Sequence, residues 1–277
     1  MSDGSTLQGG VAARNEVYGR CLRASKAAGA IRDRLYDSRA TMEVVDQMAE
    51  GSAATGSRRD RLVDLYREAA DCTRCPLAET RTKVVFGSGN ADADLMFVGE
   101  APGAEEDRQG LPFVGRAGAL LTELLGDVGL SREEVWICNV LKCRPPGNRD
   151  PQPLEVESCS PYLERQIQLI EPRVVATLGN FATRLLTRAR APISRVRGTP
   201  QVHTLAGRPV FLMPLFHPAA ALRTPSLVET LREDMARLPD LLREPLPEGA
   251  ARESATAAAI AGTAPADPDA DQLGLFG

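Results

Sequence analysis

Four cysteines are the residues of this sequence whose spacing most directly suggests a chemistry. Cys72 and Cys75 form a C-x2-C pair, and Cys143 and Cys159 follow with fifteen residues between them. Four thiolates from separated segments can hold an iron–sulfur cluster. Structural zinc sites usually close with two short C-x2-C pairs, so the long second spacing fits zinc less well. The spacing alone favours a cluster and leaves a zinc site or unliganded thiols as alternatives.

Two polar residues, Asn139 and His217, stand where strands are expected to end. Asn139 closes the apolar run 135–139, and its amide carries a donor and an acceptor on one group. His217 precedes Pro218, which disfavours helix and indicates an exit from a strand into a loop. Taken alone, Asn139 could cap a loop and His217 could be a satisfied histidine at a strand end. The other histidine, His203, lies in an expected hairpin and is interpreted as structural.

The elements that must position these residues alternate between strand and helix. Apolar runs predict strands at 94–98, 135–139 and 173–177 and a hairpin of 202–205 with 210–213. Helical spacing predicts helices at 115–128, 153–170, 180–187 and 226–242. This alternation predicts an α/β fold whose mostly parallel sheet is covered on both faces. The site should lie beyond the carboxyl ends of the strands, where the loops starting at Gly99, Asn139 and Phe216 converge.

The composition argues against a membrane or secreted protein. No apolar run approaches the ~18–20 residues of a membrane span, and the start of the chain has no basic region followed by an apolar stretch. We therefore expect a cytoplasmic protein, in which spaced cysteines serve first as metal or cofactor ligands. Cys138, inside an apolar run, is expected to be a small buried hydrophobe.

The formal net charge of −4 is distributed unevenly. Residues 244–277 contain six acids and one base, so the first 243 residues carry a net charge of +1. A near-neutral domain can still hold a basic face for nucleic acid. We expect three parts: an N-terminal extension at 1–60, partly helical or disordered, a folded domain at 61–243, and a disordered acidic tail at 244–277.

Four motifs give the chain a specific resemblance. They are GEAPGAEED at 99–107, GLPFVG at 110–115, NVLKCRPP at 139–146 and HPA at 217–219. With the four cysteines, this ordered set resembles the family 4 uracil-DNA glycosylases, the iron–sulfur-containing bacterial and archaeal enzymes, from about Leu62 to Leu242. The resemblance implies a three-layer sandwich with a central, mostly parallel four-stranded sheet, and a [4Fe–4S] cluster on Cys72, Cys75, Cys143 and Cys159.

The activity implied by the resemblance is that of a monofunctional uracil-DNA glycosylase. Such an enzyme flips uracil out of DNA and hydrolyses its N-glycosidic bond, leaving an abasic site for base excision repair. The alternative is an iron–sulfur protein that binds uracil-DNA without catalysis or covalently. A relative that binds covalently uses a histidine in an inserted loop, whereas this chain has the short sequence GNRDP at 147–151. That difference favours turnover.

The resemblance also assigns roles within the site. His217 donates a hydrogen bond to uracil O2 as negative charge builds there, and the Asn139 amide matches N3–H and O4. Phe113 stacks under the flipped base. Better-studied uracil glycosylases have a water-positioning aspartate where this chain has Ala101, so Glu100 is expected to orient the water, and Glu106 to close the pocket where the methyl group of thymine would sit. The expected catalytic residues are Glu100, Glu106 and His217, and the expected uracil-binding residues are Glu100, Ala101, Pro102, Gly103, Phe113, Asn139 and His217.

Two further contact regions are expected. The candidate DNA contacts are Arg144, Arg149, Arg195, Arg197, Leu222 and Arg223. Leu222 or Arg223 is expected to enter the DNA, because Ala221 stands where a larger apolar wedge is common. The chain ends with Gln272, Leu273, Leu275 and Phe276 in an order that resembles the pentapeptide by which bacterial repair proteins dock on the DNA polymerase sliding clamp. We expect the protein to be a monomer that binds uracil-containing DNA and this clamp.

Overall fold

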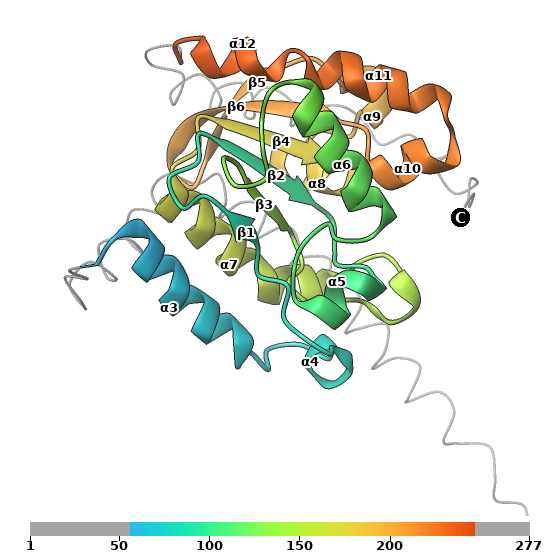
Figure 1. The fold of residues 1–277 in the computed structure, drawn as a ribbon. Coiled ribbons are helices and arrows are strands. Elements are labelled where there is room, and N and C mark those ends of the chain that lie inside the picture. Colours follow the sequence, from blue (N-terminus) through green and yellow to red (C-terminus); the bar gives the residue numbers. More distant parts are fainter. Residues whose placement is uncertain (1–55, 247–277) are drawn as a thin grey trace, which may run out of the picture.

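A six-stranded sheet forms the centre of the computed structural model, which describes residues 56–246 (Figure 1). The strand order is β1-β3-β2-β4-β6-β5. The strands are β1 (Ser88–Gly89), β2 (Leu95–Gly99), β3 (Trp136–Asn139), β4 (Val174–Leu178), β5 (Gln201–Leu205) and β6 (Arg208–Leu215). The inner four strands, β3, β2, β4 and β6, are parallel, whereas β1 and β5 pair antiparallel at the two edges.

This topology confirms the α/β sandwich and its mostly parallel sheet, with a difference in strand number. The sheet has six strands where four were expected, because each edge of the parallel core carries an antiparallel addition. The expected hairpin accounts for one of them. Ala206 and Gly207 both have positive φ, the conformation that joins β5 to β6 in a tight turn.

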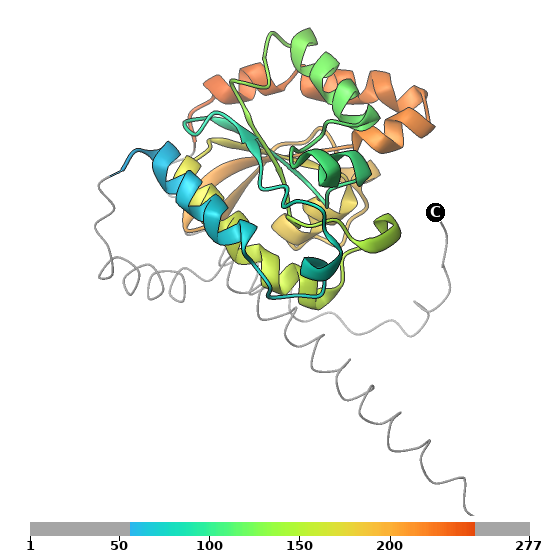
Figure 2. The same ribbon diagram turned by 60° about the horizontal axis from the view of Figure 1, so that its bottom comes forward.

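Helices cover both faces of the sheet (Figure 2). One face carries α3 (Arg58–Ala70), α7 (Pro153–Ile170) and α8 (Asn180–Thr187). The other carries α6 (Arg116–Asp127), α10 (Pro218–Arg223), α11 (Ser226–Met235) and α12 (Leu238–Arg243). The short helices between these elements are α4 (Leu77–Thr80), α5 (Ala104–Gln109), α9 (Ile193–Val196) and the 3₁₀ turn η1 (Pro146–Asn148).

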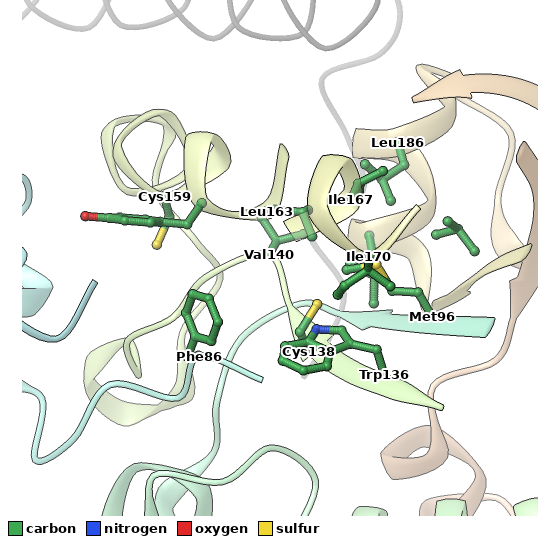
Figure 3. Close-up of a cluster of buried hydrophobic side chains, with 14 of the residues drawn as sticks. Phe86, Met96, Trp136, Cys138, Val140, Cys159, Leu163, Ile167, Ile170 and Leu186 are labelled. Carbon is green, nitrogen blue, oxygen red and sulfur yellow. The ribbon is translucent and has the colours of Figure 1, made fainter. Parts of the chain in front are cut away.

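Alternation along the inner strands divides the hydrophobic core into two layers. In β2, Met96 and Val98 pack toward α7, whereas Leu95 and Phe97 pack toward α6. Cys138 lies fully buried in the α7 layer, which confirms its interpretation as a buried hydrophobe (Figure 3). Burial also raises the pKa of its thiol.

Two expectations about helices need correction. The helix expected at 226–242 is two helices, α11 and α12, and Pro239 lies in the first turn of the second. A proline is tolerated there because the first turn has no intrahelical partner for its N–H. For the same reason Pro218 begins α10 directly after His217, where the sequence indicated a loop.

Several expectations concern residues outside this range. The N-terminal extension up to residue 55 and the clamp-binding residues Gln272, Leu273, Leu275 and Phe276 are not among the described residues. Within residues 56–246, no helix is long and apolar enough to cross a membrane.

Candidate active site

A cavity of about 600 Å³ lies at the carboxyl ends of the parallel strands. The loops that follow β2, β3, β4 and β6 contribute to its walls. It brings together every residue expected to act on the base, namely Glu100, Ala101, Pro102, Gly103, Glu106, Phe113, Asn139 and His217. Several other residues also line the cavity, among them Asn148, Gly179, Asn180, Phe181 and Ile193. They belong to none of the four motifs, so no sequence pattern marks them as site residues.

Asn139 is the last residue of β3 and is almost fully buried. It pairs in register with Gly99 at the end of β2. A Cβ atom at residue 99 would lie 2.3 Å from Asn139 Oδ1 and 2.7 Å from Phe113 Cζ, so only glycine leaves both side chains their positions. Asn139 Oδ1 is buried and has no hydrogen-bond partner in the protein. Because a buried acceptor without a partner costs free energy, this oxygen is poised to accept from a ligand in the cavity.

His217 is the N-cap of α10. Its Nδ1 accepts a hydrogen bond from the backbone N–H of Ala219 at 3.1 Å, so the ring proton resides on Nε2. Burial, followed by the charge of Arg223, lowers the pKa of His217 to about 4, while Glu106 acts in the opposite direction. The imidazole is therefore neutral at pH 7 and offers one N–H donor to the cavity.

Phe113 adopts a left-handed backbone conformation, with φ of 51°. This conformation is unfavourable for a residue with a side chain. Arg132 holds the turn, because its guanidinium donates to the carbonyl oxygens of Pro112 at 2.7 Å and Phe113 at 3.1 Å. The ring of Phe113 lies 5.7 Å from that of His217, with 31° between their planes. No sequence motif pointed to Arg132.

The two acids of the cavity have different environments. Glu106 Oε1 accepts hydrogen bonds from the backbone N–H groups of Val114 at 3.0 Å and Gly115 at 2.9 Å, at the start of α6. Glu100 is half-buried, and burial, followed by the charge of Asp150, raises the pKa of its carboxyl group. Glu106 is thus fixed as an acceptor, whereas Glu100 is the carboxyl group whose ionisation is disfavoured.

The arginines expected to contact DNA fall into two groups: two have exposed side chains, and three are bonded to another side chain of the protein. Arg223 is exposed and lines the cavity. Arg149 forms a two-pronged ion pair with buried Glu155, at 2.5 and 2.9 Å, and Arg197 bonds Asp234 at 2.6 Å. Arg144 donates to Asn148 Oδ1 at 2.7 Å. Arg195 is exposed on α9.

The wedge region follows His217 on α10. Ala221 is fully buried in the α6 layer of the core. Leu222 is partly buried against the same layer, whereas Arg223, the last residue of α10, is exposed. Of the two residues expected to enter DNA, Arg223 is thus the one whose side chain is free of the core.

The four cysteines come from three segments of the chain. Cys72 follows α3, Cys75 precedes α4, Cys143 lies after β3, and Cys159 is on α7. They are electrostatic neighbours: a charge on Cys72 acts on Cys75 and Cys143, and Cys143 and Cys75 both act on Cys159. Within residues 56–246, no three His, Cys, Asp or Glu side chains already surround a single point as metal ligands would.

Hydrogen-bond donors lie beside two of these sulfurs, whereas burial opposes their ionisation. The backbone N–H of Lys142 donates to Cys159 Sγ at 3.2 Å, and the Arg81 guanidinium lies 3.6 Å from Cys143 Sγ. Burial raises the pKa of Cys159 to about 12. Hydrogen bonds of this kind stabilise sulfur ligands of metal centres, so the donor set fits a thiolate-bound cofactor.

Comparison with known proteins gives consistent matches. A family model described as the uracil DNA glycosylase superfamily matches residues 86–241. The type-4 uracil-DNA glycosylase of Archaeoglobus fulgidus is 47% identical over 186 residues, which cover 66% of this chain and 94% of that protein. The type-4 enzyme of Thermotoga maritima is 45% identical over 190 residues, covering 67% and 97%. That of Sulfurisphaera tokodaii is 43% identical over 191 residues, covering 67% and 87%.

Proposed function

Because the chain belongs to the uracil DNA glycosylase superfamily, and within it to the type-4 uracil-DNA glycosylases, we propose that it removes uracil from DNA as the first step of base excision repair. It is a hydrolase that cleaves the N-glycosidic bond of a deoxyuridine flipped into the cavity at the strand ends. The unpartnered Oδ1 of Asn139 in that cavity is the observation that carries this proposal.

Uracil is recognised by the amide of Asn139. Oδ1 accepts from N3–H of the base, and the amide N–H group donates to O4. Cytosine presents an acceptor at N3 and donors at the neighbouring amino group, so its edge opposes both contacts. Binding uracil therefore satisfies a buried acceptor that cytosine would leave unpaired.

Bond cleavage depends on stabilising the leaving base. As the C1′–N1 bond lengthens, uracil gains negative charge at O2, and the Nε2–H of neutral His217 donates to it. The neutral imidazole keeps its single proton on Nε2, and the hydrogen bond from this N–H strengthens as the charge on O2 develops. His217 thus acts chiefly in the transition state.

Three further side chains complete the proposed site. Phe113 provides the stacking surface for the flipped base. Glu106, fixed by the N-terminus of α6, closes the cavity against the methyl group of thymine. Glu100 orients the water that attacks C1′, with the raised pKa of its carboxyl group limiting this role at acid pH.

The product is an intact strand with an abasic site. Strand cleavage by a glycosylase requires an amine that can form a Schiff base with the sugar. Of the lysines within residues 56–246, neither Lys83 nor Lys142 lines the cavity. This placement supports monofunctional chemistry.

Cys72, Cys75, Cys143 and Cys159 are the proposed ligands of a [4Fe–4S] cluster. The mutual proximity of their thiols and the N–H donors to two of the sulfurs support this assignment. When bound, the cluster supplies a structural crosslink between the segment after α3, the segment after β3 and α7. The cavity residues, not the cluster, catalyse the reaction at C1′.

Partner contacts extend the proposal beyond the cavity. Arg223 and Leu222 enter or border the DNA where the base leaves, and Arg144, Arg149, Arg195 and Arg197 contact phosphates.

The protein acts as a monomer in the cytoplasm, and Gln272, Leu273, Leu275 and Phe276 dock on the DNA polymerase sliding clamp. A peptide of residues 267–277 should bind purified clamp, and Leu275→Ala with Phe276→Ala should abolish clamp binding by the full chain without changing excision.

One assay tests the function directly. An end-labelled oligonucleotide with one uracil is incubated with the protein and then treated with alkali, in parallel with oligonucleotides carrying thymine or cytosine at that position. The proposal expects alkali-dependent cleavage at uracil alone. Binding of uracil-DNA without cleavage, or a covalent adduct that resists denaturation, would instead identify a uracil-DNA-binding protein.

A further inference from the structure

Lys142 lies inside the protein, with 1% of its surface exposed. A lysine is almost never buried to this extent unless its ammonium group is paired. Here the Nζ atom donates to the backbone oxygen of Asn139 at 2.7 Å and to Oε1 of Gln166, on α7, at 2.6 Å. Gln166 Nε2 in turn donates to the backbone oxygen of Phe86 at 2.9 Å, which orients its amide so that Oε1 faces the ammonium.

The main chain around Lys142 is held on both sides. Its N–H donates to Cys159 Sγ at 3.2 Å, and its carbonyl oxygen accepts from Val85 N at 2.8 Å. The preceding residues, Val140 and Leu141, donate their N–H groups to Gly99 O at 2.9 Å and Glu100 O at 3.0 Å. The segment 139–143 therefore connects the residue that faces the base to two of the four clustered cysteines.

Within this segment, the side chain of Lys142 supplies the anchor for Asn139. The carbonyl of Asn139 is at the end of β3, and the Nζ group of Lys142 donates a short hydrogen bond to it. Fixing this peptide group fixes the direction of the Asn139 Cα–Cβ bond. The side-chain amide is then held against Gly99 with its unpartnered oxygen in the cavity.

We propose that Lys142 is a positioning residue for uracil recognition, which acts by holding the Asn139 carbonyl so that the Asn139 amide is preorganised for the base. This inference rests on the proposed function and adds a residue that does not touch the substrate. It also gives Lys142 a role that needs no contact with the sugar, in keeping with its position outside the cavity.

Lys142→Met tests the proposal, because methionine fills much of the same space without the ammonium. The measurements are inhibition by free uracil, the single-turnover excision rate and the affinity for undamaged DNA. Removing the hydrogen-bond donor of the Asn139 carbonyl predicts uracil inhibition weaker by at least about 10-fold, with a lower rate and unchanged affinity for undamaged DNA.

Gln166→Met is the matched control. It removes a second hydrogen bond of the same Nζ group, in the same buried layer, but leaves the bond to Asn139. Uracil inhibition within about 3-fold of wild type is expected for this variant, whatever its melting temperature. Equal losses of uracil inhibition in the two variants would overturn the positioning role and leave Lys142 a general structural residue.

A double-mutant cycle separates this inference from the proposed function. If Lys142 acts through Asn139, Lys142→Met should weaken uracil inhibition no further in an Asn139→Ala background. Lys142→Gln replaces Lys142→Met if the latter does not fold, with the same expected direction. Wild-type protein that excises uracil while the Lys142 variants keep wild-type uracil inhibition would overturn this inference alone, whereas wild-type protein without excision would overturn the proposed function.

Discussion

Gly99 and Asn139 lie side by side at the ends of two neighbouring parallel strands, so close that a Cβ atom on Gly99 would stand 2.3 Å from Asn139 Oδ1. The same Cβ atom would also meet the ring of Phe113. The absence of a side chain at residue 99 thus sets the positions of the group proposed to read the base edge and of the ring proposed to stack on it.

Gly99→Ala should therefore disable the site. The added methyl group must displace the Asn139 amide or the Phe113 ring, so the single-turnover excision rate should fall by at least about 100-fold. Gly126→Ala is the control, because Gly126 is an exposed residue of α6 with no atom within 4 Å of a Cβ atom. It should keep full activity and gain about 0.5–1 kcal/mol of stability. Full activity in Gly99→Ala would show that the two side chains are not held in working positions.

The excision rate should show no step near pH 6.5, where an ordinary histidine titrates. Burial lowers the pKa of His217 to about 4, so the imidazole stays neutral from about pH 5 upward. At low pH the rate should fall as Glu100 becomes protonated. The midpoint of this fall should lie above the usual pKa of a glutamate, because burial raises the pKa of Glu100. A rate profile of wild type and Glu100→Gln checks both points. A step near pH 6.5 that Glu100→Gln retains and His217→Asn removes would contradict the neutral-donor role.

The lowered pKa of His217 also makes the stability of the protein depend on pH. Between pH 4 and about 6.5 the unfolded chain binds a proton on His217 that the folded protein does not. The free energy of unfolding should therefore rise with pH across this window, and His217→Asn should remove that part of the rise. Urea denaturation at several pH values measures it, and parallel curves for the two proteins would argue against the lowered pKa.

Arg149 and Arg223 should respond differently to truncation. Arg149→Ala leaves the buried Glu155 carboxylate without its ion-pair partner and should cost about 2 kcal/mol, or roughly 4–8 °C in melting temperature. Arg223→Ala should leave the melting temperature unchanged, weaken DNA binding and reduce the slope of log K against log salt by about 1. Thermal scans and binding titrations at three salt concentrations separate the two. An unchanged melting temperature in Arg149→Ala would contradict the stabilising role of its ion pair with Glu155.

The cysteine group predicts a visible cofactor. Aerobically purified protein should be brown with a broad absorbance near about 400 nm, and Cys159→Ala should lower the melting temperature before it lowers the single-turnover rate. Analysis of iron and acid-labile sulfide measures how many of each atom the protein holds. Colourless protein with stoichiometric zinc would contradict the assignment.

The sequence was sufficient for the parallel core and for the motif residues around the cavity. The runs 94–98, 135–139 and 173–177 are apolar in their central residues because both faces of an inner strand are buried, and this signal is local. Asn139 and His217 follow such runs, so their convergence at one sheet edge could be predicted from the topology alone.

What the sequence could not provide depends on contacts between distant segments. Arg132 supports the Phe113 turn from nineteen residues away, and Gln166 meets Lys142 across 24 residues. The ion pair of Arg197 with Asp234 is likewise a product of packing between α9 and α11. The two-residue strand β1 carries no apolar pattern of its own, because backbone pairing with β3 alone defines it.

The claim that the neutral imidazole of His217 drives departure of the base is tested most directly by the single-turnover excision rate of His217→Asn on a uracil oligonucleotide, measured beside its affinity for the same DNA. Removing a donor that acts in the transition state should lower the rate by about 100-fold or more. The dissociation constant should stay within about 3-fold of wild type, because the ground-state hydrogen bond is weak. An unchanged rate, or a loss confined to affinity, would contradict the account.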